Sequence, residues 1–209
     1  MIIKTVVIGP LQVNCYVIAD EVSKKAVVID PGDEPDRIMD VINENSLEVE
    51  YVICTHGHFD HVGAVIDIKK ETGAKVVMHK EDLDLYSSAK DAAFLWGFAG
   101  EDQPAPDMFV KDGDVIKAGG LSLEVLYVPG HSTGGICLYT GDVVVTGDTL
   151  FQGSVGRTDL PGGDIGKLKK SFQRLMVLPE NTKVLPGHGP ASTIGREKKE
   201  NMFSREFLQ

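Results

Sequence analysis

Apolar residues recur along the chain in short runs separated by polar or glycine-containing turns, a pattern typical of alternating strands and helices. In the first half, β-branched apolar runs predict strands at residues 2–8, 14–19, 25–29, 51–54 and 75–78. In the second half, similar runs predict strands at residues 115–118, 121–128, 136–139, 143–145 and 183–185. Helical spacing predicts helices at residues 34–45, 62–72, 80–90 and 164–177, and from residue 194 onward. Residues 91–107 are rich in glycine and proline and are predicted to be less regular.

The two halves repeat one architecture, because each contains a strand series, then a polar loop, then a helix. Two sheets stacked inside two layers of helices would bury the apolar faces of all of these elements. The sequence therefore predicts a mixed α/β (α+β) fold, a four-layer αββα sandwich. A length of 209 residues without a linker predicts a single domain over residues 1–209.

Residues 55–61 read Thr-His-Gly-His-Phe-Asp-His, a density of imidazole and carboxylate groups that favours divalent metals such as zinc. His56 and His58 can point the same way in an extended segment, whereas Asp60 and His61 follow at a turn and can face a second point. The alternatives are an affinity tag or a chance histidine cluster, but the run is internal and mixed. It lies between a predicted strand and a predicted helix, where open α/β folds place their chemistry, and it predicts two adjacent metals.

Other candidate ligands also follow apolar strands. His131 and His188 each end a strand-Pro-Gly-His sequence, in which the glycine would let the backbone approach a bound ion. Asp148 follows a strand and a glycine. Alone, each would be interpreted as a turn or cap residue, but together with the run at 55–61 they are candidate ligands. His79 has no glycine nearby and is predicted to be structural.

In this order, and with Asp30 after an early strand, these residues resemble the five motifs of the metallo-β-lactamase superfamily. The resemblance implies an αββα fold with a binuclear site. One metal would be held by His56, His58 and His131. The other would be held by Asp60, His61 and His188. Asp148 would bridge the two metals, and Asp30 would fix the metal loop by hydrogen bonds.

Residues 151–163 read Phe-Gln-Gly-Ser-Val-Gly-Arg-Thr-Asp-Leu-Pro-Gly-Gly and resemble the short, single-domain, glyoxalase II-like hydrolases of bacteria. Longer enzymes of that group hold glutathione with a carboxy-terminal helical domain, whereas about twenty residues follow His188 here. The resemblance implies hydrolysis of thioesters such as S-lactoylglutathione. A hydroxide formed at the two metals would attack the carbonyl carbon, and Asp60 would orient it and accept its proton. Arg157 is a candidate for binding an anionic group of the substrate, the alternative being an ion pair with Asp159.

Two other functions remain open at this point. Persulfide dioxygenases resemble the same group but use one iron, with His131 as a ligand and the second site empty. A non-catalytic metal-binding protein is the third alternative. Zinc is the metal expected for the two sites, although ligands made only of nitrogen and oxygen also accept iron or manganese.

The net charge of −10 argues against nucleic acid and against a polybasic membrane site. There is no run of 18 apolar residues and no leader-like segment, so the expectation is a cytoplasmic enzyme with a small-molecule (thio)ester substrate. Cys15, Cys54 and Cys137 each lie in an apolar run and are expected to be buried free thiols.

Overall fold

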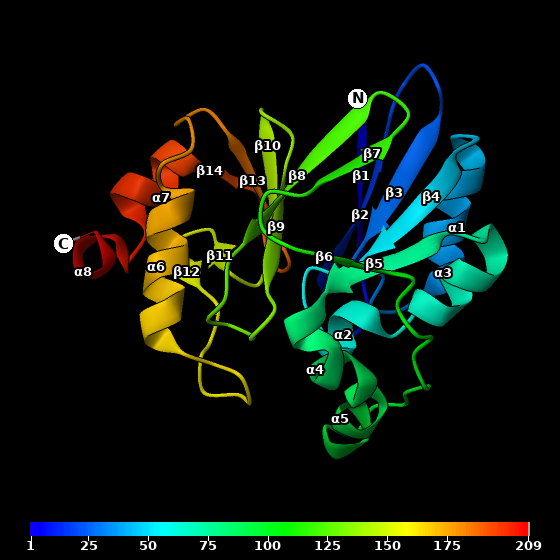
Figure 1. Ribbon diagram of the computed structural model, residues 1–209, viewed down its shortest axis with the longest axis horizontal. Coiled ribbons are helices and arrows are strands. Elements are labelled where there is room, and N and C mark those ends of the chain that lie inside the picture. The colour runs from blue at the N-terminus through cyan, green and yellow to red at the C-terminus, as the bar shows by residue number, and fades with distance from the viewer. Residues whose placement is uncertain (209) are drawn as a thin grey trace.

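The computed structural model describes residues 1–208 and contains two six-stranded sheets stacked between outer layers of helices (Figure 1). The first sheet has the order β1-β2-β3-β4-β5-β6. Its strands are β1 (Ile2–Ile8), β2 (Val13–Ala19), β3 (Lys25–Ile29), β4 (Glu48–Ile53), β5 (Lys75–His79) and β6 (Met108–Val110). The second sheet has the order β14-β13-β10-β9-β8-β7. Its strands are β7 (Val115–Ala118), β8 (Leu121–Tyr127), β9 (Ile136–Tyr139), β10 (Val143–Gly147), β13 (Lys183–Pro186) and β14 (Ser192–Thr193).

The helices divide between the two sheets, and a small hairpin lies beside the second sheet (Figure 1). On the side of the first sheet are α1 (Pro35–Glu44), α2 (Phe59–Val62), α3 (Val65–Thr72), a short 3₁₀ turn (Lys80–Asp82), α4 (Leu83–Ser87) and α5 (Ala89–Leu95). On the side of the second sheet are α6 (Ile165–Leu175), α7 (Ile194–Glu200) and α8 (Ser204–Phe207). The hairpin is formed by β11 (Leu150–Phe151) and β12 (Ser154–Val155).

Strand periodicity explains the layers. Successive residues of a strand point to opposite faces of the sheet, and every residue of β2 is buried. Cys15 and Val17 pack into the core under α1 and α3, whereas Tyr16 and Ile18 pack into the core between the two sheets. A third core lies between the second sheet and α6–α8 and includes Phe172, which is fully buried. The predicted four-layer arrangement is therefore confirmed.

The direction of the strands matters for function. β3, β4 and β5 are parallel to one another in the first sheet. In the second sheet β10 is parallel to β13, and both β8 and β10 are antiparallel to β9. The carboxyl ends of β3, β4 and β5 therefore share one edge of their sheet, and those of β8, β10 and β13 share one edge of theirs. The loops that follow these ends carry the candidate ligands predicted from the sequence.

The predicted elements differ from the structure in several places. The short strands β6, β11, β12 and β14 were not predicted, and the predicted helix at 80–90 is divided among the 3₁₀ turn, α4 and the start of α5. β4 starts at Glu48 rather than residue 51, because Lys25 of β3 pairs with Glu48 and Glu50 across the ladder. The predicted helix at 62–72 is divided into α2 and α3, and Ala64 between them donates its backbone N–H to the Pro31 carbonyl at 2.9 Å. Residues 89–95 form α5, although part of this segment was predicted to be irregular.

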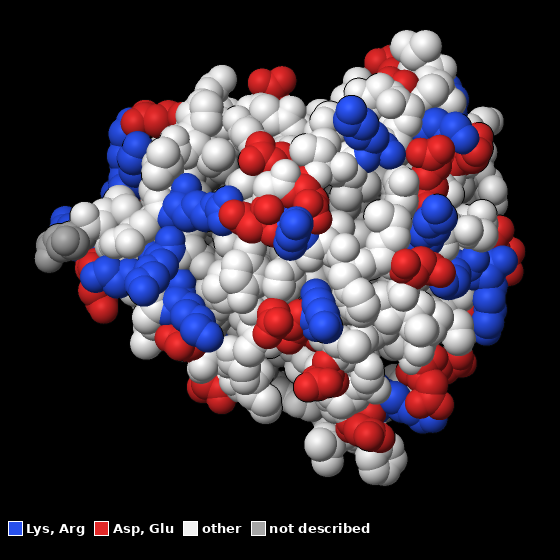
Figure 2. Space-filling model, in the orientation of Figure 1, with Lys and Arg blue, Asp and Glu red and all other residues white. Residues whose placement is uncertain are grey.

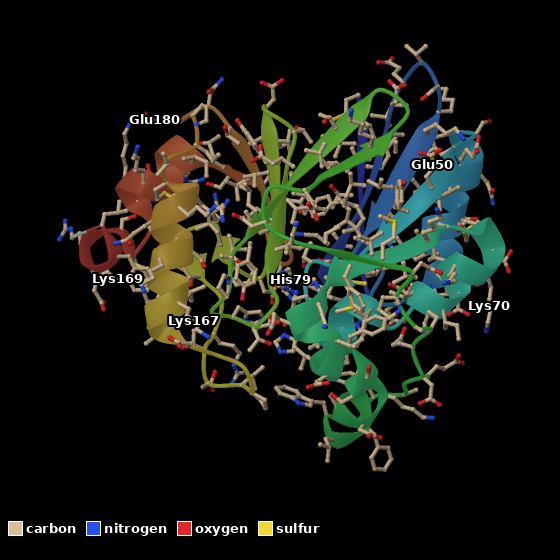
Figure 3. All side chains as sticks on the ribbon, in the orientation of Figure 1. Glu50, Lys70, His79, Lys167, Lys169 and Glu180 are labelled. Atoms are coloured by element: carbon tan, nitrogen blue, oxygen red, sulfur yellow. The ribbon has the colours of Figure 1, made fainter. Side chains whose placement is uncertain are left out.

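The three cysteines are buried free thiols, as predicted. Burial raises the pKa of each thiol, which leaves them uncharged in the core. Within residues 1–208 no helix has the length and apolar character needed to cross a bilayer. On the face shown in Figure 2, acidic and basic side chains are interspersed, and basic ones gather over α6, where Figure 3 labels Lys167 and Lys169.

Asn14 joins the two sheets. Its side-chain amide donates to the carbonyls of Pro186 and Gly189, at 2.9 and 2.8 Å, in the loop that carries His188. We expect Asn14→Ala to lower the free energy of unfolding by about 1–3 kcal/mol, since the buried carbonyl of Pro186 would lose a hydrogen-bond donor. Denaturant unfolding measures the change. Asn43→Ala, at an exposed position of α1, is the control and should change stability by less than about 0.5 kcal/mol. Equal effects of the two substitutions would contradict this role.

Candidate metal centre

The candidate ligands meet where the two sheets present their carboxyl strand ends. His56 and His58 lie in the loop after β4, and Asp60 and His61 lie on α2, the short helix that follows. His131 lies in the loop after β8. Asp148 and His188 follow β10 and β13, which are parallel neighbours. The structure thus brings together side chains that are up to 132 positions apart, from His56 to His188.

Two groups of side chains each offer one ligand atom to a common point. In the first group, atoms of His56, His58 and His131 all lie within 4.8 Å of one another. In the second group, atoms of Asp60, His61 and His188 meet the same limit. These are the two sets that the family resemblance implied.

Asp148 lies between the groups. Its Oδ1 is 3.4 Å from Nε2 of His61, and its Oδ2 is 3.6 Å from Nε2 of His131 and 3.5 Å from Nε2 of His188. One carboxylate therefore faces histidines of both groups, which is the position that a bridging ligand needs.

The residues fit divalent metal ions. Nε2 of His56, Nε2 of His58 and Oδ1 of Asp148 are buried and have no hydrogen-bond partner among residues 1–208. Two pairs of ring nitrogens face each other, His58 with His131 at 2.9 Å and His61 with His188 at 3.2 Å. Two nitrogen ligands of one tetrahedral zinc, each about 2.0–2.1 Å from the metal, would be about 3.3 Å apart. Buried polar atoms left without a partner are costly, so this donor set is suited to bound cations.

Asp30 accepts hydrogen bonds from the loop that carries His56 and His58. It is buried and has a φ of 54°, a left-handed conformation that few non-glycine residues adopt. Its carboxylate accepts from the Thr55 backbone N–H at 2.7 Å and from the Thr55 hydroxyl at 2.6 Å, and it lies 3.0 Å from Nδ1 of His61. Asp30 also lies within 4.8 Å of ligand atoms of His56 and His61. Because both of its oxygens already accept hydrogen bonds, we interpret it as orienting His61, whose Nε2 then faces the site.

A second buried carboxylate, Asp82, was not identified from the sequence. It follows β5 and is fully buried. It accepts from the Gly57 N–H at 3.0 Å and the Ser132 hydroxyl at 2.7 Å, and also from the Gly134 N–H. A Cβ on Gly134 would lie 2.8 Å from the Cβ of Asp82, so only glycine fits there. Asp82 therefore ties the loop with His56 and His58 to the loop with His131.

Glycine has a related role beside Asp148. A Cβ on Gly187 would lie 2.8 Å from Cε1 of His61 and would also contact Asp148. The Pro-Gly-His sequence before His188 therefore lets the backbone pass close to the ligands.

The charges of the candidate ligands influence one another strongly. Burial lowers the pKa of His56 and of His58, the latter to about 4, so both are neutral and have a free lone pair. Burial also opposes a charge on His61, but the carboxylates of Asp148 and Asp60 raise its pKa well above the ordinary value. Burial would raise the pKa of Asp148, but His61 outweighs this effect and lowers it. The carboxylates are thus ionised, and His61 carries a proton that a metal would have to displace.

The remaining candidates lie outside the group. Arg157 forms a two-point ion pair with Asp159 at 2.6 Å, the alternative that the sequence left open, and both side chains are exposed. Its backbone carbonyl lies 2.9 Å from Nδ1 of His131. The ring of His79, labelled in Figure 3, stacks on Tyr127, and its Nδ1 accepts from the Glu81 N–H, which fits the predicted structural role.

The chain belongs to the metallo-beta-lactamase superfamily, whose family model matches residues 8–188. Among curated relatives it is 37% identical to hydroxyacylglutathione hydrolase GloC of Haemophilus influenzae, covering 97% of this chain and 98% of that protein.

Solved structures show the same fold. TTHA1623 in a di-iron-bound form has a TM-score of 0.89 and 42% identity, covering 96% of this chain and 99% of that one. The B3 metallo-beta-lactamase BLEG-1 has a TM-score of 0.91 and 33% identity, covering 97% and 99%. ETHE1 from Myxococcus xanthus has a TM-score of 0.84 and 31% identity, covering 100% and 88%. These proteins share the fold, but their names indicate different activities.

The contacts of Asp82 lead to a prediction. Asp82→Asn would turn one acceptor oxygen into an N–H donor that faces other donors, so we expect the loop of His56 and His58 to shift relative to His131. The affinity for Zn²⁺ should fall about 10–100-fold. Competition against a chromogenic chelator measures it. Asp84→Asn, at an exposed position two residues along, is the matched control. Equal affinities for the two variants would contradict a positioning role.

The raised pKa of His61 leads to a second prediction. A charged His61 stabilises the metal-free fold below the ordinary pKa of about 6.5, and this contribution is lost as the pH rises through the raised value. Because metal binding requires the neutral ring, binding should release protons and tighten with rising pH. Calorimetric titration with Zn²⁺ near pH 7, in two buffers of different ionisation enthalpy, should show about one proton or more released per chain. A titration that releases no proton would contradict the assignment.

Proposed function

We propose that the protein is a binuclear metal-dependent hydrolase of thioesters such as S-lactoylglutathione, with zinc as the metal. The observation that supports two metals is the second group of ligands, Asp60, His61 and His188, assembled beside the first with Asp148 between them. The 37% identity to GloC, named as a hydroxyacylglutathione hydrolase, supports this substrate class.

The chain's own residues have distinct roles in the proposed reaction. Divalent ions bound here would supply Lewis acidity, which lowers the pKa of a coordinated water from 15.7 to about 7. Burial would raise the pKa of Asp60, but His61 and His188 lower it, so Asp60 is a carboxylate at neutral pH. Its Oδ2 lies 3.4 Å from Nε2 of His188, where it would orient the attacking water and accept its proton. The leaving thiol has an ordinary pKa of about 8.5 and departs as a thiolate without a protein acid, which favours thioesters over amides.

The second group of ligands is accessible to a substrate on one side. The side chain of His61 is fully buried, whereas those of Asp60 and His188 are 17% and 28% exposed. Arg157 would bind an anionic group of the substrate by exchanging its exposed partner Asp159 for a substrate carboxylate. Such an exchange costs little, because solvent and salt screen an exposed ion pair.

A second candidate is a mononuclear-iron persulfide dioxygenase. The similarity to TTHA1623 in a di-iron-bound form, together with the similarity to ETHE1, supports an iron-dependent activity as the alternative. Such an enzyme would use His56, His58 and His131 and would leave the group of Asp60, His61 and His188 without a metal. The third candidate, a non-catalytic metal-binding protein, would need the same ligands but no substrate.

We expect the protein purified from unsupplemented cells to contain about two metal ions per chain and to hydrolyse S-lactoylglutathione. His188→Ala should lower kcat by about 100-fold or more and remove about one metal ion, because it removes one ligand of the second group. Elemental analysis and thioester absorbance measure the two quantities.

His79→Ala is the matched control, a histidine outside the ligand groups whose loss should change kcat by less than about twofold. One iron per chain with oxygen uptake on glutathione persulfide would support the dioxygenase instead. Full metal content without turnover of any thioester, lactone or persulfide would support the non-catalytic alternative.

A further inference from the structure

A cavity of about 330 Å³ lies beside the metal ligands, at the Asp60 end of the site. This volume lies within the range of roughly 300–1,000 Å³ that is typical of small-molecule sites. The cavity is bounded by the β1–β2 turn, by the segment from Gly32 to Pro35, by α2 and α3, and by α5 with the residues that follow it. The function proposed above does not use it.

Many of the residues that line the cavity are small. Those residues include Gly32, Gly63, Ala64, Ala89, Ala93 and Ala99. Its larger walls are apolar, and the rings of Phe59 and Phe98 stack with their centroids 5.7 Å apart. Leu11 and Val13 contribute the wall formed by the β1–β2 turn and the start of β2. These surfaces are complementary to an apolar group of the substrate.

The cavity adjoins the second group of ligands at Asp60. Asp60, a member of that group, forms part of the wall. Leu11 forms another part, and its backbone carbonyl lies 3.0 Å from Nδ1 of His188. A substrate whose carbonyl carbon lies at the metal ligands can therefore extend one substituent past Asp60 into the cavity.

The charges at the two ends of the site differ. The carboxylates of Asp33, Asp67 and Glu101 line the cavity, and among the described lining residues only Lys90 is basic. Lys90 is already paired with Asp102 at 2.7 Å. At the opposite end, the backbone carbonyl of Arg157 lies 2.9 Å from Nδ1 of His131, and the exposed guanidinium of the same residue is paired with Asp159. An anionic group is therefore disfavoured in the cavity, whereas near His131 it would find the guanidinium of Arg157 by displacing the exposed carboxylate of Asp159.

We propose that the cavity binds the uncharged, apolar acyl chain of the thioester, while the anionic thiol portion lies toward Arg157. This assignment rests on the thioesterase function proposed above and specifies its substrate class. The enzyme would prefer medium-length aliphatic acyl groups over acetyl and over acyl groups that end in a carboxylate.

The test uses the zinc-loaded protein and S-acetyl-, S-butyryl- and S-hexanoylglutathione. Each added methylene that enters the cavity should raise kcat/KM about fourfold, so the four methylenes that hexanoyl has beyond acetyl should give a ratio of about 250. Ala99→Trp would fill the cavity from an exposed position and should lower this ratio at least about tenfold. Ala105→Trp makes the same change at an exposed alanine that does not line the cavity, and should leave the ratio unchanged.

A second comparison tests the charge. S-adipoylglutathione has an acyl chain as long as hexanoyl but ends in a carboxylate, and its kcat/KM should be at least about tenfold lower. Glu101→Gln should reduce this difference, because it removes one of the carboxylates that line the cavity.

Three outcomes would each overturn the assignment. The first is a value of kcat/KM that does not depend on acyl chain length. The second is an equal effect of the two tryptophan substitutions, and the third is equal use of adipoyl and hexanoyl substrates. Those outcomes would leave thioester hydrolysis itself intact. Absence of hydrolysis for every thioester would instead overturn the proposed function and, with it, this substrate preference.

Discussion

Ionisable side chains from two different sheets are held within hydrogen-bonding range of one another, and much of the structure around the site serves to keep them there. Burying a carboxylate or an imidazole costs free energy unless a partner compensates it. Here the side chains compensate one another only in part. Asp148 faces His61, His131 and His188, but its Oδ1 and the Nε2 atoms of His56 and His58 have no hydrogen-bond partner among residues 1–208. The fold makes this convergence geometrically simple. The strands that deliver the ligands run parallel within each sheet, so their carboxyl ends lie at common edges.

Two further carboxylates fix the positions of the loops that carry the candidate ligands. Asp30 binds the backbone and side chain of Thr55 and contacts His61, and Asp82 joins Gly57 to Ser132 and Gly134. Both are buried acceptors that satisfy N–H groups which the loops could not satisfy by themselves. The left-handed backbone conformation of Asp30 costs free energy, and the hydrogen bonds of this network offset it. Strained residues persist where the surrounding contacts determine their conformation.

Much of this arrangement could be predicted from the sequence, and the exceptions have physical reasons. The apolar, β-branched run of β2 and the Pro-Gly-His sequences are local signals, and the strands and the candidate ligands were found from such signals. Asp82 gave no such signal. It lies in an acidic, helix-like stretch between Glu81 and Asp84, and its burial depends on contacts with residues about 50 positions away. α5 was hidden by the glycines and prolines that follow it, although its own alanines favour a helix.

The two ends of the metal centre are chemically different, and this difference bears on how a substrate can lie there. The His131 end contacts the segment of Arg157, whereas the Asp60 end opens toward an apolar cavity with acidic residues along its walls. A thioester has the same asymmetry when its thiol portion is anionic and its acyl portion is apolar. A persulfide of glutathione has an anionic peptide portion but no acyl chain, and it would leave the cavity beside Asp60 unused. The cavity and the second ligand group lie at the same end of the site; the proposed thioester hydrolase would use both, whereas an enzyme with one iron near His131 would use neither.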